Sequence, residues 1–180
     1  MSARSVLLLR AVNVSGRNRV PMAELRAVLD EHTTLTGVRT YIASGNVIVD
    51  TPSDADSACA RVRELIGQRF DVDTPVIHRS HQALDAALAE NPFADAASDK
   101  LLHVMFLEGE AEPGAIAALT PRLVEGERIS LIGRDLWIDY GPGGVHSTKL
   151  TKSVLDRALG VAGTARNLRT VRTLHELTAV

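Results

Sequence analysis

Short apolar runs alternate with helical patterns along the first half of the chain. Residues 5–11 form an apolar run that is too short and too sharply bounded for a helix, which predicts a buried strand. A polar loop containing a glycine follows at residues 13–19. Pro21 fits the first position of a helix, because apolar residues recur after it at three- and four-residue spacing.

The next elements complete a recognisable order. Two β-branched runs, at residues 38–42 and 47–50, are separated by a turn-forming Ser-Gly-Asn sequence and predict a hairpin. Asp54 or Ser53 is expected to cap a second helix, and residues 75–78 are expected to form a short strand. The resulting order, β-α-β-β-α-β, is that of the ferredoxin-like split unit.

A similar pattern restarts after residue 100. Ser80 is expected to cap a short connecting helix, and the small, polar residues 95–99 form the best linker in the chain. The elements predicted after it are a strand at residues 101–107, a helix opened by Pro113, hairpin strands at residues 128–132 and 135–140, and a helix ending at Gly160. Thr164 is expected to cap a last helix, so the second half is predicted to be β-α-β-β-α-α.

The two patterns together predict an α+β protein built of two halves. We expect residues 1–80 to form a ferredoxin-like α+β subdomain and residues 81–99 to form a connecting helix and linker. Residues 100–180 are expected to form a second α+β subdomain. Residue identities do not repeat between the halves, so their relation rests on the order of elements alone.

Composition favours a soluble protein. Apolar residues make up 45% of the 180 residues and charged residues 23%, which excludes a disordered chain. The apolar runs are far shorter than the roughly 20 residues that span a bilayer, and the N-terminal residues show no signal-peptide pattern. The single cysteine, Cys59, fits a reducing compartment. We therefore expect a cytoplasmic protein with no membrane partner.

Charge is segregated along the chain. Residues 1–23 carry four arginines and no acid, and residues 141–180 carry six basic and two acidic side chains. Each segment is therefore +4, and the net charge of −2 leaves −10 for the residues between them. Two basic segments can form one basic patch if the fold brings them together, although they can equally be two ordinary solvated surfaces.

Basic and polar side chains also gather where helices are expected to begin. A helix N-terminus exposes unpaired N–H groups and a partial positive charge, so cations there are unfavourable unless an anion binds. In a β-α-β-β-α-β unit, the first crossover loop and the hairpin turn lie at the same end of the sheet. We therefore expect an anion site in a cleft between the halves, lined by Arg10, Asn13, Asn18, Arg19, Ser44, Asn46, Lys149, Lys152, Arg166 and Asn167.

Other kinds of site are excluded by spacing. The six histidines form no HExxH motif and have no cysteine partners, so no metal is expected. Residues 141–149 lack the residues that flank the lysine of a Walker A loop, and no cofactor is expected. The strands expected at residues 6–9 and 47–49 carry no aromatic residue, which disfavours base stacking on the sheet.

Several segments carry a family resemblance. Residues 9–22 with Asn13-Val14-Ser15-Gly16-Arg17-Asn18, residues 40–47 with Ser44-Gly45-Asn46, the Asn91-Pro92-Phe93 motif, and residues 149–151 and 164–171 together resemble the bacterial family catalogued as domain of unknown function 1697. This family usually has glycine where the chain has Ala11 and Ser15. The resemblance implies an α+β fold with a ferredoxin-like N-terminal part, and it implies no activity.

Three hypotheses of function remain. The first is a protein that binds a phosphate-bearing small molecule or a nucleic acid. The second is an enzyme that uses Lys149 or Lys152 as an acid, a base or an electrostatic catalyst. The third is a structural or interaction module in which the polar residues cap helices and tie the two halves together.

Overall fold

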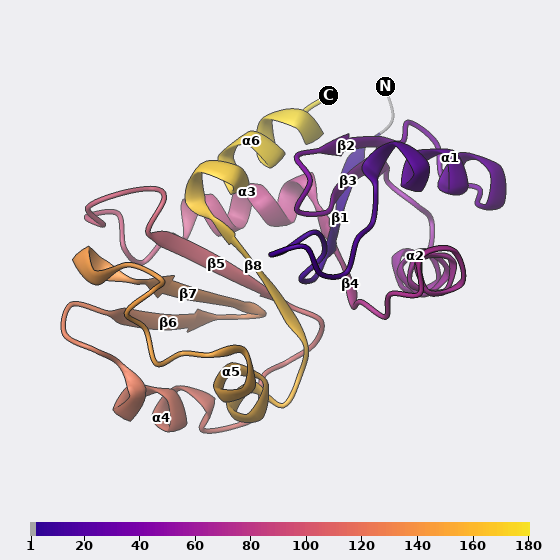
Figure 1. Cartoon of the computed structure of the whole chain (residues 1–180). Helices are drawn as coiled ribbons and strands as arrows, with labels where there is room; N and C mark the ends of the chain where they lie inside the picture. The colour runs from indigo at the N-terminus through magenta and orange to yellow at the C-terminus, as the bar shows by residue number, and fades with distance from the viewer. Residues whose placement is uncertain (1–2) are drawn as a thin grey trace. The chain divides into compact units, whose positions relative to one another are not determined.

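The computed structural model describes residues 3–180, and these residues form two four-stranded antiparallel sheets and six α-helices (Figure 1). Contacts divide the chain into two compact units. Unit 1 comprises the residues up to Asp85 together with Leu174–Val180, and unit 2 comprises Ala86–Thr173. The predicted α+β class with two halves is confirmed. Within residues 3–180, no helix is both long and apolar enough to cross a bilayer.

Unit 1 has the predicted element order, β-α-β-β-α-β. Its elements are β1 (Arg4–Leu9), α1 (Met22–His32), β2 (Arg39–Tyr41), β3 (Asn46–Asp50), α2 (Ala55–Phe70) and β4 (Val76–Ser80). The strands are ordered β2-β3-β1-β4, and all three pairs are antiparallel. The predicted cap of α2 is Asp54, whose carboxylate accepts a hydrogen bond from the Ser57 N–H at 3.0 Å.

The core of unit 1 lies between the sheet and the helices α1 and α2, which cover one face of it (Figure 1). Alternate residues of β1, such as Leu7 and Leu9, point into this core, and Leu25 and Ile66 meet them from α1 and α2. The intervening residues of β1 are also buried. A strand buried on both faces has a continuous apolar run rather than an alternating one, which explains the sequence of β1.

Unit 2 repeats this arrangement. Its elements are β5 (Leu102–Leu107), α4 (Ala115–Leu119), a 3-10 turn (Thr120–Arg122), β6 (Arg128–Ile132), β7 (Asp135–Asp139), a second 3-10 turn (Gly141–Gly143), α5 (Lys152–Leu159) and β8 (Gly163–Asn167). The strand order is β6-β7-β5-β8, with α4 and α5 packed on one face of the sheet (Figure 1). This order matches that of unit 1 position by position.

The prediction that Thr164 caps the last helix is wrong. Thr164 lies within β8, and α6 (Leu168–Thr178) begins after Asn167, whose side chain accepts a hydrogen bond from the Thr170 N–H at 2.9 Å. Residues 163–167 have no apolar run, so they form a strand only because they pair with β5. Gly163 permits this pairing, since a Cβ atom there would lie 2.7 Å from Met105 Cε.

Two helices contribute to both units. The connecting helix α3 (His81–Ala89) starts in unit 1 and continues into unit 2, and α6 starts in unit 2 and ends in unit 1. Within unit 1 their ends are in contact. The rings of His81 and His175 stack with centroids 4.4 Å apart, and His81 Nδ1 lies 3.0 Å from the buried hydroxyl of Thr178.

Candidate functional site

The loop after β1 is held in one conformation by Asn13. Its amide nitrogen donates to the carbonyl oxygens of Val20 at 2.8 Å and Ala43 at 2.7 Å, and its amide oxygen accepts from the Val20 N–H at 2.9 Å. Asn18 braces the same loop by donating to the Ala11 carbonyl at 3.0 Å. These contacts fold the loop onto itself and attach it to the β2–β3 turn.

The turn between β2 and β3 is tied down in the same way. Asn46 is fully buried, and its amide nitrogen donates to the Tyr41 carbonyl at 3.0 Å and to the Ser44 hydroxyl at 3.2 Å. The Leu9 N–H donates to the Gly45 carbonyl at 2.8 Å. The predicted proximity of the loop and the turn is therefore confirmed. We refer to residues 10–20 and 41–46 together as the loop–turn edge.

The backbone of the loop–turn edge is strained. Besides its glycines, it has positive φ at Ala11, Asn13, Ser15, Asn18 and Ile42, with values from 50° to 55°. The left-handed region costs an L-residue roughly 1–2 kcal/mol, and a β-branched residue there is a true outlier. Strain of this kind persists where the surrounding structure enforces it, and it concentrates at functional sites.

Replacing Ala11 and Ser15 with glycine should stabilise unit 1. We expect the double variant Ala11→Gly/Ser15→Gly to raise the free energy of unfolding by about 1 kcal/mol, because relief of the left-handed strain exceeds the added entropy of the unfolded chain. Urea denaturation measures this change. Ala60→Gly, at an exposed helical position of α2, is the control and should lower stability by roughly 0.5–1 kcal/mol. A loss of stability in the double variant would contradict the interpretation that the backbone is strained at these two positions.

Exposed arginines and exposed apolar side chains lie together at this edge. Arg17 and Arg19 are exposed, and neither guanidinium has an ion-pair partner among residues 3–180. Val14 is 54% exposed and Ile42 is 49% exposed. Arg10 is half-buried, and its backbone is clamped by Thr74, whose hydroxyl accepts from the Arg10 N–H at 3.0 Å and donates to the Arg10 carbonyl at 2.7 Å.

A hollow of about 510 Å³ opens beside Arg19. Its walls come from the loop, the start of α1 and the end of β2. They are formed by Asn13, Arg19, Val20, Pro21, Met22, Thr40, Ile42 and Ala43. Arg19 is the charged member of this set, and most of the other side chains are apolar.

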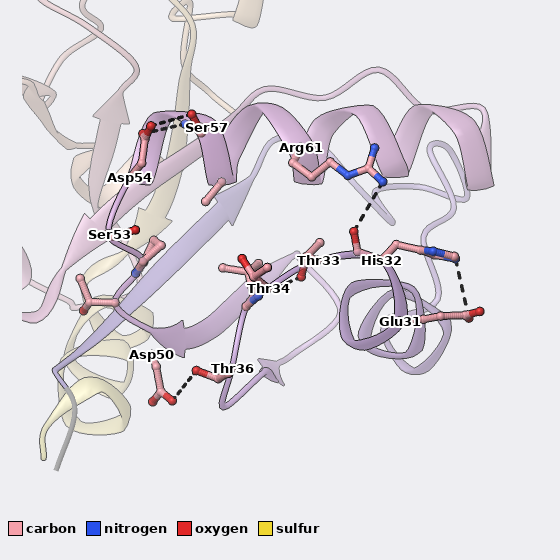
Figure 2. A pocket seen from close by; sticks show the side chains of 14 residues that line it. Glu31, His32, Thr33, Thr34, Thr36, Asp50, Ser53, Asp54, Ser57 and Arg61 are labelled. Atoms are coloured by element: carbon pink, nitrogen blue, oxygen red, sulfur yellow. Dashed lines mark hydrogen bonds and ion pairs between the residues drawn. The ribbon is translucent and has the colours of Figure 1, made fainter.

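A larger pocket of about 720 Å³ lies at the opposite end of β3, between the end of α1 and the start of α2. Figure 2 shows hydroxyl groups of Thr33, Thr34 and Thr36 around it, with Asp50 and Asp54 nearby. Its charged groups are engaged with other residues of unit 1. The Asp50 carboxylate accepts from Thr36 at 2.8 Å, Asp54 caps α2, and Arg61 pairs with Glu64 at 2.6 Å.

The ionisable side chains of this hydroxyl-lined pocket also have the wrong balance for an anion. Glu31, Asp50 and Asp54 contribute three carboxylates, and Arg61 contributes one guanidinium beside the imidazole of His32. An anion would therefore meet net negative charge here. The loop–turn edge, which has arginines and no acidic residue, is the better anion site.

The predicted site residues of unit 2 have mainly structural contacts. Lys152 is exposed and pairs with Asp156 at 3.8 Å, while Lys149 is exposed in the preceding loop. Arg166 is buried and donates to the Thr164 hydroxyl at 2.7 Å and to the Ala165 carbonyl at 2.9 Å. Burial lowers the pKa of Arg166 to about 10. Asn167 caps α6.

The starts of α5 and α6 are therefore capped by the chain itself. Thr151 accepts a hydrogen bond from the Val154 N–H at 3.4 Å, as Asn167 does from Thr170. Arg10 to Asn46 of the predicted set belong to unit 1, and Lys149 to Asn167 belong to unit 2. The structure brings together the members of each group, and the convergence of the two groups on one cleft stays a prediction.

The Asn91-Pro92-Phe93 motif has a structural role in unit 2. The Arg128 guanidinium lies over the Phe93 ring, 4.6 Å from its centroid, and pairs with Asp95 at 3.0 Å and Asp139 at 2.6 Å. Asn91 accepts a hydrogen bond from the Phe93 N–H at 2.9 Å. The motif thus connects the segment that was predicted to be a linker to the β6–β7 hairpin.

Sequence reasoning did not select Arg17, Val14 or Ile42 as site residues. Arg17 contributed only to the charge count, and Ile42 fitted the end of a strand. One feature of the sequence could have indicated Arg17: residues 1–23 contain no acidic residue, so Arg17 lacks a nearby acid in the sequence just as Arg19 does. Exposure of two apolar side chains beside them is visible only in the folded unit.

Comparisons with known proteins agree with the fold. The model of a family described as protein of unknown function (DUF1697) matches residues 2–137. The solved structure of the conserved bacterial protein SP0830 from Streptococcus pneumoniae is similar, with a TM-score of 0.74 and 23% sequence identity. The match covers 99% of this chain and 100% of that one, and at this identity it supports the fold alone. No curated protein matches.

Proposed function

The chain belongs to this family of proteins of unknown function, and we propose that it is a binding protein that holds the phosphate of an anionic ligand at the loop–turn edge. Arg17 and Arg19 supply the charge. The amides of Asn13, Asn18 and Asn46 hold the loop and the turn in place.

The grouping of two exposed arginines in a loop without acidic residues carries this proposal. Residues 10–20 and 41–46 contain no aspartate or glutamate that could serve as an ion-pair partner. Arg17 and Arg19 have no such partner among the described residues. A guanidinium fork matches a phosphate as well as a carboxylate. A loop that is already ordered loses little entropy on binding, which favours affinity.

Removing both guanidinium groups should abolish most of the binding. We expect Arg17→Ala/Arg19→Ala to weaken the affinity for pyrophosphate at least tenfold in isothermal titration calorimetry, because a hydrogen bond to a charged group contributes about 1.5–3 kcal/mol. The free energy of unfolding should stay the same or rise, since two like charges are removed.

The matched control removes the same charge at other exposed positions. Arg69→Ala/Arg157→Ala changes two exposed helical arginines, one in each unit, and should leave the affinity nearly unchanged. Equal weakening by both double variants would show that net charge alone attracts the anion and would overturn the proposed site.

The enzyme hypothesis receives less support from the structure. A catalytic lysine is usually activated by burial or by a neighbouring cation. Lys149 and Lys152 are both exposed, and Lys152 pairs with an acid. Binding at unit 1 is therefore the function that the geometry favours.

A further inference from the structure

We infer that the ligand is a small phosphate ester whose apolar or aromatic group occupies the hollow beside Arg19, and that Ile42 is the residue that selects it. This inference rests on the proposed function, because Arg19 both belongs to the anion site and lines the hollow. It goes further by assigning a chemical class to the part of the ligand beyond the phosphate.

The hollow has the size and lining of a small-molecule site. Its volume of about 510 Å³ falls within the range of roughly 300–1,000 Å³ that is usual for ligand pockets. Pro21, Met22 and Ile42 give it apolar walls, and Thr40 adds a hydroxyl group. One cation beside an apolar wall is complementary to an anion that is attached to an apolar group.

In the protein without a ligand, isoleucine at position 42 is energetically unfavourable in two respects. Its φ of 50° is a rare conformation for a β-branched side chain, and half of that side chain is exposed to water. Glycine or asparagine at this turn position would avoid both penalties. An apolar side chain that is held in a strained conformation and presented to a hollow is explained by contact with a ligand.

The position of Ile42 is also fixed before any ligand binds. Asn13 donates to the carbonyl of Ala43, the next residue, at 2.7 Å. The Arg26 guanidinium donates to the Thr40 hydroxyl on the other side. Ile42 therefore stands between two anchored neighbours, and the wall of the hollow is preorganised.

Size and composition favour a monomeric ester over a nucleic-acid strand. Proteins that hold single strands stack successive bases on several aromatic side chains. Residues 10–20 and 41–46 contain one aromatic residue, Tyr41, which is half-buried. One hollow beside Arg19 suits one phosphate and one attached group.

Calorimetry with three probes tests the inference. Phenyl phosphate and adenosine monophosphate carry a phosphate and a flat aromatic group, whereas pyrophosphate carries phosphate alone. We expect the wild-type protein to bind both esters more tightly than pyrophosphate. Ile42→Gly should weaken ester binding about tenfold, leave pyrophosphate binding unchanged, and keep or raise the midpoint of urea denaturation.

Two further variants provide an alternative substitution at Ile42 and a control. Ile42→Asn also tolerates the left-handed conformation and should reproduce the selective loss if the glycine variant is poorly folded. Val145→Ser removes an exposed apolar side chain of unit 2 that does not line the hollow, and it should bind the esters as the wild type does.

Each contrary result has a distinct meaning. Equal affinity for esters and pyrophosphate overturns the inference and leaves the proposed function standing. The absence of binding to every phosphate probe overturns the proposed function itself. Parallel loss of stability and of binding to all probes would make Ile42 a packing residue, and tighter binding of an oligonucleotide than of its monomer would overturn the assignment to a small ester.

Discussion

Asn13→Ala should lower the free energy of unfolding by about 3 kcal/mol. The variant loses three hydrogen bonds, two to carbonyls and one from an N–H, each of which contributes roughly 0.5–1.5 kcal/mol. Alanine also adopts the native φ of 55° less readily than asparagine. Urea denaturation measures the change, and the loss should be accompanied by weaker binding of pyrophosphate because the loop is no longer held in place.

Asn18→Ala is the matched control. Asn18 has a similar φ of 50° and makes one side-chain hydrogen bond, to the Ala11 carbonyl. Its replacement should therefore cost about half as much as that of Asn13. Equal losses in the two variants would show that the backbone conformation, and not the bridge from Asn13 to Ala43, dominates the stability of the loop–turn edge.

Gly141→Ala should destabilise the protein by about 3 kcal/mol or more. Gly141 has a φ of 59°, and an added Cβ atom would overlap the carbonyl of Gly126, with the carbonyl carbon only 2.8 Å away. Backbone atoms cannot move aside as a side chain can, so overpacking adds to the left-handed strain. Thermal or urea denaturation measures the loss.

Gly133 provides the comparison. It has a nearly identical φ of 55°, and no atom lies within 4 Å of a Cβ placed there. Gly133→Ala should therefore cost about 1 kcal/mol, the conformational part alone. If the two variants lose the same stability, the close approach of the two glycine backbones does not contribute.

The order of elements in unit 1 was predictable because local patterns and topology agree there. The apolar run of β1, the spacing in α1 and the Ser44-Gly45-Asn46 turn each specify one element. In this topology the crossover loop and the hairpin turn lie at the same end of the sheet. That rule predicted that Asn13 and Asn46 lie close together before any contact between the loop and the turn was known. Both side chains bind carbonyls of the same turn.

β8 was not predictable because its stability is non-local. Residues 163–167 contain two polar residues, one arginine and two small residues, and they carry no strand pattern of their own. Pairing with β5, which is about 60 residues earlier, makes them a strand. The same applies to Ile42, whose sequence neighbours are typical of a strand while its conformation depends on the bridge from Asn13 to Ala43.

The contribution of α6 to unit 1 affects the order in which the protein can fold during translation. Leu174–Val180 are synthesised after the whole of unit 2, yet they belong to unit 1, where His175 stacks on His81 and Thr178 contacts the same ring. Domains usually fold from the N-terminus as they leave the ribosome. Here unit 1 can be completed only after the whole of unit 2 has been made, so a nascent chain that lacks these seven residues should contain an incomplete unit 1.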